Sequence, residues 1–188
     1  MWPLGHAAIA YLLYSGSTHA RHGAPPGAVA VLVVLFGSLF PDLVDKPLAW
    51  YAGVLPNGRT LAHSLLVLVP LCLAVFLIAR RYGRSEYGVA FAVGALSHSL
   101  VDAVPVLWDP EANADFLFYP LTGGEPYEGD GAPGVVDLFL SSLSDPYFLS
   151  EFAFASLALA LWVRDGYPGL ALLRTRVSRY VPRLERPG

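Results

Sequence analysis

Four long apolar runs, separated by short polar stretches, dominate the pattern of the chain. They cover residues 27–40, 61–79, 87–108 and 147–163. A membrane-spanning helix needs about 20 predominantly apolar residues, so the second and third runs are long enough to cross a bilayer and the other two are short for a crossing. A fifth run at 2–14 is shorter still, which favours a buried or partial span. The pattern predicts an all-α membrane helix bundle of about five hydrophobic segments.

Composition agrees with this interpretation. Of the 188 residues, 55% are hydrophobic and only 14% are charged, whereas ordinary soluble domains carry about 25% charged residues. A large core does not explain the deficit, because a chain of this size must still cover a large surface. The only cysteine, Cys72, lies inside an apolar run, and we interpret it as a small core hydrophobe.

Arginine residues predict how the segments are oriented. One cluster lies at 80–84 and another after residue 163, whereas 109–151 holds nine acidic residues and no Lys or Arg. The positive-inside rule places both basic clusters in the cytoplasm, and two segments separate them, as that rule requires. The N-terminus is then outside, and 15–26 forms a cytoplasmic loop. We expect a membrane-embedded domain at 1–164, with an extracytoplasmic acidic loop at 109–146, and a basic cytoplasmic tail at 165–188.

Two local features refine this picture. Pro41 disfavours a helical conformation at the preceding residue, so we expect the second segment to end or kink near Phe40. Asp42 then lies in the first turn of a new helical segment, where free N–H groups favour a carboxylate. The stretch "VVDLFLSSL" within the acidic loop is predicted to form a short helix at the membrane interface, because its apolar residues fall on one face.

Six ionisable side chains interrupt or border the apolar runs. Such residues are costly in a bilayer and usually face a bundle interior or a cavity. By the orientation above, all of them come from the outer ends or outer halves of four separate segments. They are His6, Asp42, Asp45, His63, His98 and Asp102.

Spacing within the set is compatible with a shared site. His98 and Asp102 are four residues apart and Asp42 and Asp45 three apart, so each pair shares one helical face. Simpler interpretations exist for each feature alone. His6 could be a hydrogen-bonded packing residue. The two aspartates of the second segment could be a solvated helix end, and the fourth segment could hold a neutral buried pair. Their agreement on one side of the membrane favours a site.

The residue types indicate a metal. Imidazole and carboxylate ligands together suit zinc best, or manganese or iron, rather than calcium. Three histidines and three aspartates exceed the needs of one tetrahedral ion, which leaves a two-metal site, or one metal with a general base, as alternatives. Arg59, four residues before His63, is suited to bind an anionic substrate group such as a phosphate.

The motifs "GH", "FPDLVD", "RTLAHS", "LSHSLVDA" and "FLFYPL" occur in this order between residues 5 and 121. In this order they resemble the membrane-bound, metal-dependent hydrolase family, also described as LexA-binding, inner-membrane-associated hydrolases. The resemblance implies that His6, Asp42, His63, His98 and Asp102 are metal-site residues. It also implies phosphoester substrates, because the family is likened to zinc-dependent phospholipase C.

Two positions depart from the family's motifs. The family commonly has Asp-x-Asp where this chain has Asp42-x-x-Asp45, and it often has a histidine where this chain has Gly58. We therefore expect Asp45 to act as a general base or as a residue behind the ligands, and Arg59 to hold the substrate anion.

These observations predict a membrane-integral, metal-dependent hydrolase that acts on a small-molecule or lipid substrate in the bilayer. A metal or proton transporter, or a non-catalytic protein with a structural metal, are the alternatives. Neither a Gly-rich phosphate loop nor a Gly-x-Ser-x-Gly motif is present in the sequence, and we expect no nucleic-acid partner.

Overall fold

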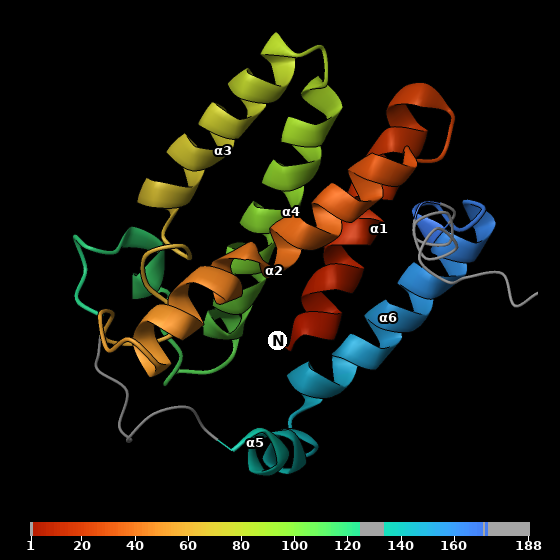
Figure 1. The fold of residues 1–188 in the computed structure, drawn as a ribbon. Coiled ribbons are helices and arrows are strands. Elements are labelled where there is room, and N and C mark those ends of the chain that lie inside the picture. The colour runs from red at the N-terminus through yellow and green to blue at the C-terminus, as the bar shows by residue number, and fades with distance from the viewer. Residues whose placement is uncertain (1, 125–133, 171, 173–188) are drawn as a thin grey trace, which may run out of the picture.

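A computed structural model describes residues 2–124, 134–170 and 172. Within these ranges the chain is helical and contains no strand, so the predicted all-α class is confirmed (Figure 1). The α-helices are α1 (Pro3–His22), α2 (Ala28–Trp50), α3 (Leu65–Arg81), α4 (Ser85–Ala103), α5 (Val135–Ser142) and α6 (Pro146–Arg164), with 3₁₀ turns η1 (Val104–Leu107) and η2 (Asp115–Phe118).

Helices form in all five predicted segments, but fewer than five are long and apolar enough to span a membrane. The described residues contain three such helices, at Ala28–Trp50, Ser85–Leu107 and Pro146–Arg164. α3 has only 17 residues, because the apolar run at 61–79 begins in an irregular loop and the helix starts after Ser64. Ser64 caps that start by accepting a hydrogen bond from the Leu66 N–H.

α1 is longer than the sequence predicts. The expected loop at 15–26 is helical as far as His22, and the helix ends at Gly23, whose φ of +64° is the left-handed conformation that commonly closes a helix. Ser17 and Thr18, which favour turns in isolation, instead bond their hydroxyls to the Tyr14 carbonyl of the same helix. The polar composition that predicts a loop is therefore accommodated on a helix.

α2 does not end near Phe40, so the predicted helix end at this position is wrong. The helix continues through Pro41 and Pro47 to Trp50. Asp42 and Asp45 consequently lie in the second half of one continuous helix rather than in the first turn of a new one. The predicted sharing of one helical face by these two aspartates does not depend on this error, because both residues are helical.

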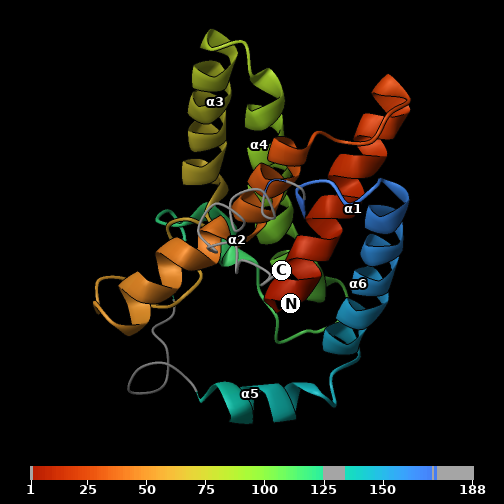
Figure 2. The same cartoon turned by 45° about the vertical axis from the view of Figure 1, so that its right-hand side comes forward.

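Glycines allow α2 and α4 to pack closely. A Cβ at Gly94 would lie 2.3 Å from the Val34 carbonyl oxygen, and one at Gly37 would lie 2.7 Å from the Phe91 carbonyl oxygen. α3 packs against the same helix at Gly88, where a Cβ would lie 2.5 Å from the Phe76 Cα. These contacts fix α4 between its two neighbours. α1 packs against α2 and α4 on another side of the bundle, and α6 packs against α1 (Figures 1 and 2).

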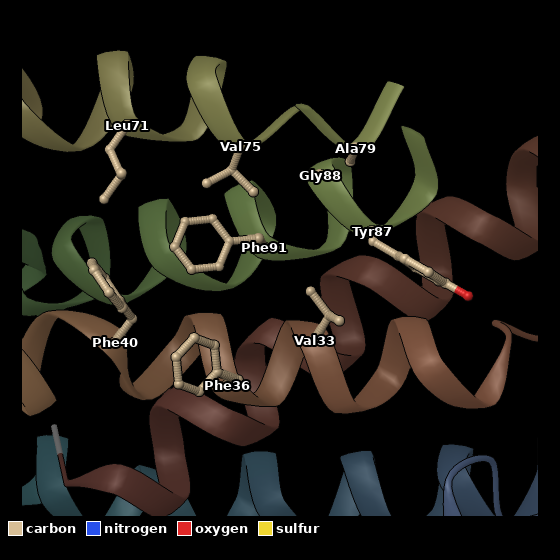
Figure 3. Close-up of a pocket in the computed structure, with 9 residues that line it drawn as sticks. All are labelled: Val33, Phe36, Phe40, Leu71, Val75, Ala79, Tyr87, Gly88 and Phe91. Carbon is tan, nitrogen blue, oxygen red and sulfur yellow. The ribbon is translucent and has the colours of Figure 1, made fainter. Parts of the chain in front are cut away.

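An apolar groove of about 410 Å³ runs between α2, α3 and α4 (Figure 3). Phe36, Phe40 and Phe91 line it, with Leu71 and Val75 on the facing helix. No ionisable residue of the predicted site lines this groove. The groove is apolar, like the surface formed by the exposed leucines elsewhere on α3, as expected for a surface that faces lipid.

The predicted short helix in the acidic loop is confirmed as α5. In Figure 2 it lies crosswise at the bottom of the view, and a short connection joins it to the start of α6. Its Phe139 contacts the rings of Trp2 and Phe148 at centroid distances of 5.6 and 5.7 Å, which ties α5 to the starts of α1 and α6. The middle of the acidic loop, 125–133, and most of the predicted basic tail, 171 and 173–188, lie outside the described residues.

Candidate metal centre

Three side chains from three different parts of the chain meet at the end of α2. The Nε2 atoms of His63 and His98 lie 3.1 Å apart. The Oδ1 atom of Asp42 lies 3.5 Å from the first and 3.6 Å from the second. Two imidazole nitrogens bound at 2.0–2.1 Å to one tetrahedral zinc ion would be about 3.3 Å apart. The three atoms therefore form a triangle of the size that a single ion requires.

The other nitrogen of each imidazole determines what this triangle can bind. Nδ1 of His98 contacts the Ser38 carbonyl oxygen at 2.6 Å, and Nδ1 of His63 contacts Oδ2 of Asp45 at 2.8 Å. Both partners are acceptors, so both Nδ1 atoms carry a proton. In the neutral imidazoles each Nε2 then presents a lone pair. Two lone pairs at 3.1 Å are favourable only with a proton or a metal ion shared between them.

Asp45 holds the loop that carries His63. Oδ1 of Asp45 accepts the Ala62 N–H at 2.8 Å. Its Oδ2 accepts the backbone N–H groups of Thr60 at 2.9 Å and His63 at 3.2 Å, in addition to the imidazole proton. The side chain is completely buried. Asp45 therefore supports a candidate ligand: it orients His63 by accepting hydrogen bonds from both the imidazole ring and the backbone N–H of that residue.

Charge around His63 favours a cation at its Nε2 atom. Burial alone lowers the pKa of this histidine, but its hydrogen bonds to Asp42 and Asp45 outweigh burial and raise the pKa. The same carboxylates that attract a proton would attract a metal ion in its place.

A second group of ligand atoms adjoins the first. His6, His98 and Asp102 each offer an atom within 4.8 Å of the others. Nε2 of His6 lies 3.2 Å from Oδ1 of Asp102, and the His6 ring stacks on that of His98 at a centroid distance of 3.8 Å. Both groups need His98, whose Nδ1 already donates to a carbonyl. With one nitrogen left to offer, the geometry favours one ion rather than two.

Two cations border the centre. Oδ2 of Asp42 pairs with Nζ of Lys46 at 2.6 Å, and Oδ2 of Asp102 pairs with Nε of Arg59 at 2.9 Å. Each carboxylate thus directs one oxygen toward a cation and the other toward histidines. The Arg59 side chain is half exposed. Arg59 is therefore accessible to a ligand from outside.

Two polar clusters were missed by the sequence analysis. Glu151, which is 1% exposed within α6, accepts hydrogen bonds from the backbone N–H groups of Trp2 and Gly5. Asp165 accepts the hydroxyls of Tyr11 and Ser15, both at 2.6 Å, near the other end of α1. The only sequence signal for the first is that Glu151 interrupts an apolar run.

Asp165 also pairs with His19 at 2.7 Å, so His19 is not in a solvated loop. Burial raises the pKa of Asp165, but the hydrogen bonds from its three partners outweigh burial and lower it. This cluster joins α1 to the end of α6 and belongs to no group of metal-ligand geometry in the described residues.

All five residues that the sequence predicts as metal ligands lie in one cluster, with Asp45 and Arg59 around it. Comparison with known proteins gives a family for the whole helical part of the chain. No curated protein and no solved structure matches it. The model of the YdjM inner membrane protein family matches residues 1–164, which include every residue of the cluster, and the chain belongs to this family.

Proposed function

We propose that this inner membrane protein is a metal-dependent hydrolase with a single divalent-metal site formed by His63, His98 and Asp42. The observation that carries the proposal is the pair of Nε2 lone pairs 3.1 Å apart, each fixed by a hydrogen bond at the opposite ring nitrogen. Two neutral acceptors at this distance repel each other, and a shared cation relieves the repulsion. Oδ1 of Asp42, 3.5 and 3.6 Å from the two nitrogens, supplies the third ligand that a metal ion needs. Three protein ligands that leave a position open are typical of catalytic zinc sites.

The donor set fits zinc, and manganese or iron would accept the same ligands. When bound, such an ion supplies Lewis-acid polarisation and lowers the pKa of a water molecule. The chain's own residues hold the geometry. Asp45 keeps His63 in the tautomer that presents Nε2, and Ser38 does the same for His98.

His6 and Asp102 would complete the site beside the three ligands. Oδ2 of Asp102 lies 3.9 Å from Nε2 of His63, close enough to join the coordination sphere after a small movement or to accept a proton from a bound water. His6 would orient Asp102 through its contact with Oδ1. Asp45, with four hydrogen bonds already made, is a positioning residue in this scheme and not the general base.

A phosphoester, including one on a lipid, is the substrate class that the surroundings favour. Arg59 offers planar N–H donors at the exposed side of the centre, which suit phosphate oxygens. Leu43, Leu61 and Leu66 lie next to the ligands in sequence and are exposed, so the centre is bordered by lipid-compatible surface. An amphiphile with its anionic group at Arg59 could remain in the bilayer while it reacts.

Transport of the metal or of protons is less well supported. The cluster of Asp165 provides polar groups near the far end of α1, but an apolar layer separates it from His6. This layer consists of the buried residues Ala8, Ala10, Val31 and Val34. A transporter needs a polar path through the bundle. Zinc uptake into liposomes that contain the protein would contradict the one-sided site.

Metal analysis of the detergent-purified protein tests the proposal. We expect one zinc, manganese or iron per chain, lost in His98→Ala and strongly reduced in Asp102→Ala. Hydrolysis of phosphodiester and phospholipid substrates should disappear in the same variants and should not return with added metal. A wild-type protein that binds no stoichiometric metal under metal-replete conditions would overturn the proposal.

A further inference from the structure

α1 begins without a cap from its own sequence. Trp2, at the N-cap position, makes no side-chain capping bond, and the first turn contains no acidic residue. Pro3 supplies no N–H at all. The first N–H groups of a helix need partners from elsewhere when they are buried. His6 follows within this first stretch, so its position depends on how the start of α1 is held.

Glu151 of α6 supplies the missing cap. One carboxylate oxygen accepts the Trp2 N–H, and the other accepts the Gly5 N–H at 3.1 Å. Gly5 directly precedes His6 in the chain. A carboxylate at this place also interacts favourably with the positive end of the helix dipole. Because an ionisable group inside an apolar helix is costly, this contact gives Glu151 a physical reason to be there.

We infer that Glu151 is a positioning residue for the metal centre, acting through His6. By holding the first turn of α1 from the neighbouring helix α6, it sets the depth at which His6 stacks on His98 and meets Asp102. This goes beyond the proposed function, which uses only side chains that touch the centre. It rests on that function for one of the two measurements below and is independent of it for the other.

Asp165 provides a matched control. Like Glu151, it joins α6 to α1 through a buried carboxylate, but its partners Tyr11, Ser15 and His19 all lie beyond His6 along α1, the nearest about one and a half turns away. Loss of either carboxylate weakens the packing of α6 on α1. Only loss of Glu151 should disturb the centre.

The first measurement uses cobalt as a spectroscopic probe and zinc for affinity. Glu151→Gln keeps the shape but places an amide N–H against one of the two donors, and Glu151→Asp keeps the charge but shortens the reach. Both should change the visible spectrum of the cobalt-loaded protein and weaken zinc binding about tenfold, as substitutions behind metal ligands do. Asp165→Asn should do neither. In a His6→Ala background, Glu151→Gln should add nothing further.

The second measurement needs no metal. Diethyl pyrocarbonate modifies neutral imidazole, and the buried His6 of the chelator-treated wild type should react slowly. Glu151→Gln and Glu151→Asp should accelerate this modification, located by mass spectrometry, and Asp165→Asn should not. Equal effects of substitution at Glu151 and at Asp165, or an undiminished effect of Glu151→Gln on zinc binding in the His6→Ala protein, would overturn the inference. Absence of metal from the wild type would overturn the proposed function alone, because the modification rates would still decide this question.

Discussion

Replacing Asp45 by asparagine tests the arrangement around His63 most directly. The carboxylate accepts four hydrogen bonds, one on Oδ1 from Ala62 and three on Oδ2 from Thr60 and His63. Asn in its best orientation keeps an oxygen toward the three donors. Its amide nitrogen then faces the Ala62 N–H, so two donors point at each other in a completely buried position.

The size of the effect follows from this geometry. Each buried donor left without an acceptor costs about 1–3 kcal/mol. Two such donors give a loss of at least about 2 kcal/mol in the free energy of unfolding. For a chain of this length, that loss lowers the melting temperature by about 4–8 °C. The same variant should bind zinc about 10–100-fold more weakly, because His63 loses the partner that fixes its tautomer.

Asp42→Asn is the matched control. Asp42 is a ligand in the proposed site, but its other oxygen pairs with Lys46, which is one-third exposed, so the stability change should be about 1 kcal/mol or less. Thermal unfolding of chelator-treated protein in detergent, with zinc titration in parallel, separates the two roles. Asp45→Asn should lose stability and affinity, and Asp42→Asn should lose mainly affinity. An Asp45→Asn protein that melts at the wild-type temperature would refute the reasoning.

Three further predictions concern the metal, the helix packing and the far cluster. Zinc added at about 100 times its dissociation constant should stabilise the chelator-treated protein by about 2.7 kcal/mol, and His98→Ala should abolish this thermal shift; an unchanged shift in the variant would contradict a ligand role. Gly94→Ala should destabilise by about 1–3 kcal/mol because its Cβ meets the Val34 carbonyl, whereas Gly16→Ala, where nothing lies within 4 Å, should be neutral or slightly stabilising in the same melts. Because its partners lower the pKa of Asp165, that carboxylate stabilises the fold above the ordinary carboxyl pKa of about 3.9 and loses its contribution as the pH falls below it. The difference in unfolding free energy between wild type and Asp165→Asn should therefore shrink as the pH falls below this value, and a difference that grows there would contradict this assignment.

Apolar run lengths were sufficient to predict the class of the fold and the helical segments, because lipid leaves few alternatives to a helix. They were less reliable at helix boundaries. Leu61, Ala62 and His63 continue an apolar run, yet they form a loop, because the backbone N–H groups of Ala62 and His63 bond to the Asp45 carboxylate instead of helix carbonyls. Pro41 led us to expect a break in the helix. The helix continues through Pro41, because close packing of α2 against α4 outweighs the local preference.

The candidate ligands were predictable because each one violates the apolar pattern of its segment. Their meeting point was also predictable, since it followed from the arginine distribution and not from the ligands themselves. The roles of the individual residues within the cluster were not predictable from the sequence. Nothing local distinguishes Asp42 from Asp45, which occupy neighbouring turns of one helix. The distinction comes from a loop 15 to 18 residues later in the chain, whose N–H groups reach only Asp45.

The same reasoning explains why the supporting residues determine the chemistry here. A histidine and an aspartate in contact could be a packed pair, and the motif alone does not exclude it. The acceptors behind the rings favour a cation site: a carbonyl of Ser38 and a fully engaged carboxylate of Asp45 hold both Nε2 atoms toward each other. Keeping two bases 3.1 Å apart is costly unless a cation is shared between them. Because both rings are fixed by the fold itself, the proposed metal site would need no rearrangement by a substrate.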